Sequence, residues 1–103
     1  MNKLLTYFEG EKERVGFVLR DGTLVEVANH CSDPENGFEV SGEDIIRYTD
    51  DAVATWHTHP GETNNLSVGD YQTFLSWPNL RHFIIGTNGI REYYVEDGEV
   101  LIA

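Results

Sequence analysis

Hydrophobic and polar residues alternate in short segments separated by turn residues, a pattern typical of a sheet with helices around it. Apolar and β-branched residues fill positions 15–19 and 23–27. The Asp21-Gly22 pair between these segments predicts a hairpin with a type I′ turn, because both residues tolerate the positive φ angles that such a turn needs. Three more strands, joined by turns into an antiparallel meander, are predicted at 82–85, 90–95 and 99–102.

Helices are predicted at three places. The first is a short helix over residues 2–10, and the charged residues that follow it limit its length. Ser41 and Ser67 are each followed three residues later by an aspartate, an arrangement typical of a helix N-terminus; the second of these helices ends before Pro78. The side chains expected to face the core are Leu4, Leu5 and Phe8, then Ile45, Ile46 and Tyr48, then Tyr71, Phe74 and Leu75.

The remaining segments complete a predicted α/β fold. Residues 29–37 are rich in Asn, Asp, Ser, Pro and Gly and are predicted to form a loop, followed by a short strand at 38–40. Residues 52–57 are predicted to form a buried strand, and a second loop covers 59–66. We therefore expect a mixed, mostly antiparallel sheet flanked by two or three helices.

Length and charge narrow the classes of protein. The 103 residues predict a single domain, 1–103, with a radius of gyration of about 13 Å. Seven Lys and Arg residues against 18 Asp and Glu residues give a net charge of −11, and the basic residues are scattered, which argues against nucleic-acid or membrane partners. Charged residues occur so near the N-terminus that the hydrophobic region of a signal peptide cannot form there. No apolar run is long enough to span a membrane, so we expect a cytoplasmic protein.

One segment, residues 57–70, carries the strongest chemical signal. His57 and His59 are two residues apart on a predicted strand, so their side chains project from the same face toward one metal ion. Asp70 follows in the first turn of the next helix, where its carboxylate can return to the end of that strand. Two histidines and one carboxylate leave the fourth position of a tetrahedral zinc ion open to water, as in catalytic zinc sites. The alternatives are ordinary strand histidines and a purely structural helix cap.

The same segment resembles the metal signature of the JAB/MPN (JAMM) zinc metallopeptidases. That signature is H-x-H-P, here at 57–60, followed by a serine and an aspartate, here Ser67 and Asp70. Residues 13–19 resemble the first block of the family, in which a glutamate precedes a glycine-containing strand. The residues that resemble the prokaryotic and phage-tail branch are Asn29, Asp33, Pro34, Phe38, Glu43 and Asp44, and the likeness extends over about residues 9–95.

The resemblance implies an MPN-like (cytidine deaminase-like) fold that binds one zinc ion (Zn²⁺) per chain through His57, His59 and Asp70. It also implies that Glu13 is the general acid/base for zinc-bound water attacking the carbonyl of a peptide or isopeptide bond, and that Ser67 stabilises the oxyanion. Glu9 and Glu11 are rivals of Glu13, which is favoured because it alone keeps a three-residue step to Gly16.

The substrates that the resemblance implies are a ubiquitin-like protein tail or a peptidoglycan peptide. A partner protein is expected to help bind the substrate. The alternative function is a non-catalytic assembly or binding module on the same fold, such as a phage tail component, and the protein would then be associated with a phage tail rather than cytoplasmic.

The single cysteine argues against other kinds of catalytic site, and the remaining histidines are not expected to be ligands. A nucleoside deaminase needs a P-C-x-x-C zinc motif, which a chain with only Cys31 lacks. One cysteine also excludes an internal disulfide, and no base is implied beside it for a cysteine peptidase. His30 and His82 lack ligand spacing, so we expect them to be surface or strand residues.

Overall fold

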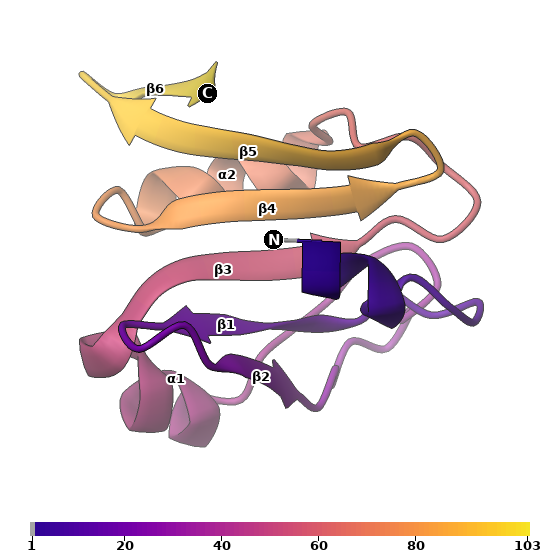
Figure 1. Cartoon of the computed structure of the whole chain (residues 1–103), viewed down its shortest axis with the longest axis horizontal. Helices are drawn as coiled ribbons and strands as arrows, with labels where there is room; N and C mark the ends of the chain where they lie inside the picture. The colour runs from indigo at the N-terminus through magenta and orange to yellow at the C-terminus, as the bar shows by residue number, and fades with distance from the viewer. Residues whose placement is uncertain (1) are drawn as a thin grey trace.

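A six-stranded mixed sheet forms the centre of the protein, whose computed structural model describes residues 2–103 (Figure 1). The strands are β1 (Val15–Leu19), β2 (Leu24–Val27), β3 (Ala52–Thr58), β4 (Arg81–Gly86), β5 (Gly89–Glu96) and β6 (Glu99–Ile102), in the spatial order β2-β1-β3-β4-β5-β6. Strands β3 and β4 are parallel, and the other neighbouring pairs are antiparallel. The predicted α/β composition and the mixed, mostly antiparallel sheet are confirmed.

The helices lie on both sides of this sheet. They are η1 (Asn2–Tyr7, a 3-10 helix), α1 (Gly42–Tyr48), η2 (Thr49–Asp51, also 3-10) and α2 (Val68–Ser76). Figure 1 shows α1 and α2 behind the sheet and η1 in front of it. Helix α2 belongs to the connection between β3 and β4, because parallel strands need a crossover rather than a tight turn. At the N-terminus, η1 ends at Tyr7 and is a 3-10 helix, so it is shorter and more tightly wound than the helix predicted over residues 2–10.

The hairpin of β1 and β2 is confirmed, but its turn differs from the prediction. The backbone N–H of Gly22 donates to the Leu19 carbonyl at 2.9 Å. Gly22 has a φ of +90°, whereas Asp21 keeps a negative φ, so the two positive angles of a type I′ turn are not present. That pair of angles occurs instead between β5 and β6, at Asp97 (φ 53°) and Gly98 (φ 77°).

The predicted strand at 38–40 is wrong. The backbone N–H of Glu39 donates to the Asn29 side-chain oxygen at 3.0 Å, and the carbonyl of Glu39 accepts from the N–H of His30 at 2.8 Å. These bonds tie the segment to the preceding loop, so its backbone groups are not offered to a sheet neighbour.

Three side chains expected in the core are exposed instead. Leu5 is 46% exposed, Ile46 81% and Tyr71 37%. Helix α1 has no buried residue, because this short helix covers only the margin of the sheet. Helix α2 does dock on the sheet, and it does so through Phe74, which is 1% exposed.

Core side chains pack on both faces of the sheet. In front, Leu4 of η1 packs in a cluster with Trp56 and Ile85. Gly16 lies opposite Trp56 in the pairing of β1 and β3, and a Cβ atom at Gly16 would overlap the indole ring and a backbone oxygen of β2, so glycine is required there.

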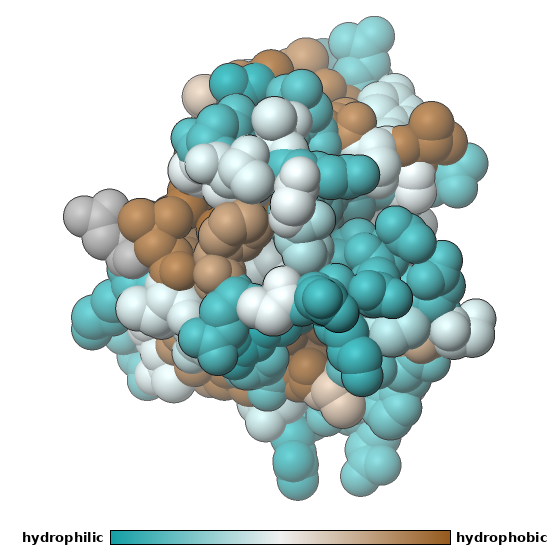
Figure 2. All heavy atoms as spheres, turned by 90° about the vertical axis from the view of Figure 1, so that its right-hand side faces the viewer, coloured by the Kyte–Doolittle hydropathy of each residue, from teal (hydrophilic) through white to brown (hydrophobic). Residues whose placement is uncertain are grey.

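The radius of gyration is 12.4 Å, close to the expected value. Within residues 2–103, no helix has the length and apolar character needed to cross a bilayer. The surface in Figure 2 is mainly hydrophilic, and its apolar side chains gather in separate patches.

Candidate metal centre

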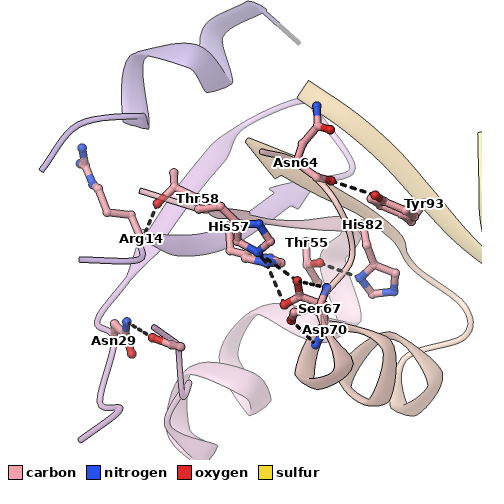
Figure 3. A network of polar contacts seen from close by, with 12 residues as sticks. Arg14, Asn29, Thr55, His57, Thr58, Asn64, Ser67, Asp70, His82 and Tyr93 are labelled. Carbon is pink, nitrogen blue, oxygen red and sulfur yellow. Dashed lines mark hydrogen bonds and ion pairs between the residues drawn. The ribbon is translucent and has the colours of Figure 1, made fainter. Parts of the chain in front are cut away.

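The three predicted metal ligands converge at one end of β3. His57 is near the end of this strand, His59 directly follows it, and Asp70 lies in the first turn of α2. The His57 Nε2 atom is 3.1 Å from Nε2 of His59 and 3.0 Å from Oδ1 of Asp70, and Nε2 of His59 is 3.0 Å from Oδ2 of Asp70. Figure 3 shows His57 and Asp70 pointing toward one another. All three side chains are buried.

These separations fit a tetrahedral metal ion. Nitrogen and oxygen ligands about 2.0–2.1 Å from a zinc ion lie about 3.3 Å apart. Each observed distance, 3.0 to 3.1 Å, is close to that value, and Asp70 faces His57 through Oδ1 and His59 through Oδ2. The two histidine nitrogens and either oxygen of Asp70 could therefore approach one ion after small movements.

The tautomer of His59 also fits a metal ligand. Its Nδ1 lies 2.9 Å from the Thr63 carbonyl oxygen, which can only accept, so Nδ1 carries the proton. In the neutral ring, Nε2 then presents a lone pair, and this lone pair faces the carboxylate of Asp70. Two acceptors repel unless a proton or a cation lies between them. A carbonyl that fixes the tautomer from behind is typical of metal-binding histidines.

Burial and shared hydrogen bonds shift the pKa values of these three side chains in different directions. Burial raises the pKa of the Asp70 carboxyl, but the hydrogen bonds from His57 and His59 outweigh it and hold that pKa below its usual range. Burial lowers the pKa of His57, despite its contact with Asp70. For His59, burial also lowers the pKa, but the contacts with Asp70 and Thr63 prevail and raise it. These contacts thus favour the protonated form of His59 and the ionised form of Asp70, whereas burial favours the neutral form of His57.

Glu13 is the glutamate that the fold brings to the histidines. Val15 pairs with His57 across β1 and β3, and continuing this antiparallel register by two residues places Glu13 opposite His59. Ligand atoms of Glu13 and the two histidines lie within 4.8 Å of one another. Glu13 is buried, whereas its rivals Glu9 and Glu11 are exposed.

The environment of Glu13 changes its acidity. Burial raises the pKa of this carboxyl to about 7, and the nearby His59 opposes the rise. A carboxyl with a pKa near neutrality can both accept and donate a proton at neutral pH, the property required of a general acid/base.

Ser67 is placed by a capping box. Its Oγ accepts from the backbone N–H of Asp70 at 3.1 Å, and its own N–H donates to Oδ2 of Asp70 at 3.2 Å. The helix cap therefore holds the carboxylate that faces the histidines, so the structural and the functional interpretations of this pair coexist. Ser67, Asp70 and Glu13 line the same small cavity of about 130 Å³.

Several supporting residues were not singled out by their spacing. Asn29 donates from Nδ2 to the carbonyls of Glu13 (2.9 Å) and Gly37 (3.0 Å), and this tethers the glutamate to the loop (Figure 3). Thr58 accepts at Oγ1 from the N–H of Arg14 at 2.9 Å and extends the pairing of the two segments. The sequence signals at Asn29 were its position in a turn-rich stretch and its match to the prokaryotic and phage-tail branch in the resemblance, and neither indicated this tether.

The loop between His59 and Asp70 is fixed by β4 and β5. Asn64 donates from Nδ2 to the Gly89 carbonyl at 3.1 Å, and its backbone N–H donates to Oδ1 of Asn88 at 2.9 Å. Its carbonyl accepts from the Tyr93 hydroxyl at 2.8 Å (Figure 3). This anchoring holds the neighbouring Thr63 carbonyl against His59.

His82, the other histidine near the site, is a buried strand residue rather than a ligand. Its Nε2 donates to the Trp77 carbonyl at 3.0 Å, and its Nδ1 accepts from the Thr55 hydroxyl at 2.7 Å. Its ring stacks on Phe74 with centroids 4.1 Å apart. His30, in contrast, is exposed.

A scan against protein-family models finds no match to this chain, and a search of curated proteins finds no related sequence.

Proposed function

We propose that this protein is a zinc metallopeptidase of the JAMM type on an MPN-like fold, which hydrolyses a peptide or isopeptide bond. The observation that carries the proposal is the convergence of two imidazole nitrogens and one carboxylate within 3.0 to 3.1 Å, with a buried glutamate beside them. This donor set, together with a general acid/base, is what metal-assisted amide hydrolysis needs.

In this proposal, His57, His59 and Asp70 hold the metal ion. When bound, a zinc ion supplies Lewis acidity, which polarises a carbonyl oxygen and lowers the pKa of water to about 7. The Thr63 carbonyl keeps His59 in the tautomer whose Nε2 is free to bind. The helix cap at Ser67 keeps the carboxylate of Asp70 directed at both histidines.

Glu13 is the proposed proton carrier. Its carboxylate accepts a proton from the attacking water and returns it to the leaving nitrogen of the cleaved bond. Burial raises the pKa of this carboxyl to about 7, and a bound zinc ion would lower it again, which favours the carboxylate form that accepts the first proton. The tether from Asn29 fixes the backbone of Glu13 relative to the histidines.

Ser67 is the proposed oxyanion donor. Its Oγ accepts from the backbone of α2, so the hydroxyl proton remains available for a substrate oxygen in the cavity that it shares with Glu13. A donor fixed in place before the reaction stabilises the negative charge that develops on the carbonyl oxygen.

Metal binding is tested first, on the purified protein after removal and reloading of zinc. We expect one zinc ion per chain by metal analysis, and loss of tight binding in His57→Ala, His59→Ala and Asp70→Asn. His30→Ala is the matched control, because this histidine is exposed and outside the cluster. Absence of zinc after loading, or full retention of zinc in His57→Ala with His59→Ala, would contradict the proposed ligand set.

Turnover is tested next, on isopeptide-linked, ubiquitin-like tail and peptidoglycan-derived substrates. Glu13→Gln keeps the size of the side chain but removes its base, so we expect a loss of at least about a hundredfold in kcat with zinc still bound. Glu11→Gln, two residues away and exposed, should retain wild-type kcat. Equal rates for wild type and Glu13→Gln would refute the role of Glu13. Zinc binding without turnover of any substrate would favour the assembly or binding module.

A further inference from the structure

A second cavity, of about 220 Å³, lies next to the proposed metal centre. Its floor is formed by β1 and β3, and its walls come from α1, α2 and the loop before α1. The side chains that define it are mainly apolar: Phe17, Phe38, Val40, Ile45, Thr73 and Trp77.

This cavity adjoins the one at the proposed metal centre. Phe38 and Thr73 line both cavities, so they form the boundary between the two. The Phe38 ring also packs against the ring of His57, with centroids 4.6 Å apart. A peptide whose carbonyl lies at the metal centre therefore has a neighbouring side chain within reach of the apolar cavity.

The size of the cavity fits one side chain. An apolar cavity of about 150 Å³ is enough to bind benzene, whereas pockets for drug-sized ligands measure about 300 to 1,000 Å³. At about 220 Å³, this cavity accommodates a single aromatic ring or branched aliphatic group.

The wall formed by α1 is not part of the packed core. Helix α1 has no buried residue, and Ile45 is only half-buried at the edge of the cavity. Filling the cavity with a ligand would cover Ile45 and would not displace a core side chain. Glu39 lies at the same cavity, and with the net charge of −11 it disfavours an acidic occupant.

We propose that this apolar cavity binds a branched aliphatic or aromatic side chain of the peptide substrate, next to the cleaved bond, and thereby determines specificity. The proposal rests on the proposed peptidase function for its role in catalysis, but binding to the cavity is measurable without metal or turnover. Contacts in an apolar pocket of this kind discriminate between side chains by about 10- to 200-fold for each methylene group.

Binding is tested on metal-free protein by two-dimensional NMR with three probes: the N-acetyl amides of leucine, phenylalanine and glycine. We expect the leucine and phenylalanine probes to shift the Trp77 indole and the Val40 amide, and to bind at least tenfold more tightly than the glycine probe. Ile45→Trp fills the cavity and should abolish this difference. Ile46→Trp, the same change on the next residue, which is 81% exposed, should preserve it. Equal binding of all three probes, or equal behaviour of the two variants, would overturn the proposal.

Specificity is tested on zinc-loaded protein with peptides that differ at one residue beside the cleaved bond. We expect kcat/KM to favour leucine or phenylalanine over glycine by at least tenfold, and Ile45→Trp but not Ile46→Trp to remove the preference. Turnover without any preference would overturn the specificity role while leaving the peptidase intact. Absence of turnover would refute the proposed function, and the NMR result would still decide whether the cavity binds apolar side chains.

Discussion

Acidification should destabilise the protein through His82, a histidine that is buried in its neutral form. The ring is 0% exposed, and both of its nitrogens have hydrogen-bond partners that suit the neutral tautomer. Burial holds the pKa of His82 at about 4, against an ordinary value of 6.5. Protonation would place a charge against the stacked ring of Phe74, and no carboxylate within residues 2–103 forms an ion pair with His82.

The sign and size of the effect follow from linkage. Between pH 6.5 and 4 the unfolded chain binds a proton at this position and the folded protein does not, so the stability falls as the pH falls. The difference of about 2.5 pH units between the two pKa values corresponds to about 3 kcal/mol in the free energy of unfolding. The stability from this source is fully present above pH 6.5, and its loss is complete below pH 4.

Urea unfolding of metal-free protein, followed at intervals from pH 4 to 7.5 in the presence of a chelator, measures this dependence. Other groups also titrate in this range, so the comparison is with His82→Gln, which cannot gain the charge. We expect the curve of the wild type to be steeper than that of His82→Gln by about 1 kcal/mol per pH unit near pH 5. His30→Gln is the matched control: this side chain is exposed when folded as well as unfolded, so its curve should match the wild type.

Parallel stability curves for the wild type and His82→Gln between pH 4 and 6.5 would refute the reasoning. That result would mean that His82 is charged in the folded protein, and the hydrogen bond to Trp77 and the stack on Phe74 would then need another explanation.

Three further predictions concern the support of the metal centre. Gly86→Ala should lower zinc affinity at least tenfold, measured by competition with a chelator, because its Cβ would overlap the backbone at Asn64; Gly42→Ala, with open space around it, should leave affinity unchanged. Asn29→Ala removes four hydrogen bonds and should cost about 2 kcal/mol by urea unfolding, with kcat reduced more than zinc affinity; a variant with wild-type kcat would contradict the tether. Phe74→Ala should cost about 3–5 kcal/mol in the same unfolding assay, and a loss below 1 kcal/mol would show that α2 does not dock through this ring.

The convergence of His57, His59 and Asp70 was predictable because these residues are close in the sequence. A strand places His57 and His59 on one face by its period of two, and a helix cap places Asp70 in the first turn after a loop. These are rules of backbone geometry that do not depend on the rest of the fold. The structure brings the three side chains together, while the identity and role of the ion stay predictions.

The position of Glu13 could not be derived in this way. Its approach to His59 depends on the pairing of β1 with β3, two strands between which the chain forms β2, a long loop, α1 and η2. No local pattern specifies which strands become neighbours, so only the resemblance distinguished Glu13 from Glu9 and Glu11. The failed strand at 38–40 has the same origin, because the side chain of Asn29 satisfies the backbone that a sheet neighbour would otherwise bind.

The proposed metal-binding segment, residues 57–70, depends on a strand that carries none of the candidate ligands. Ordering a residue costs about 1–2 kcal/mol in backbone entropy, so residues 57–70 alone would not hold three donors within 3.1 Å of each other. The loop inside this segment gains its order from Gly89 and Tyr93 of β5, which bind Asn64. Since these contacts involve none of the candidate donor atoms, folding meets most of the ordering cost, and the free energy of the proposed metal binding would be available for affinity rather than for building the site.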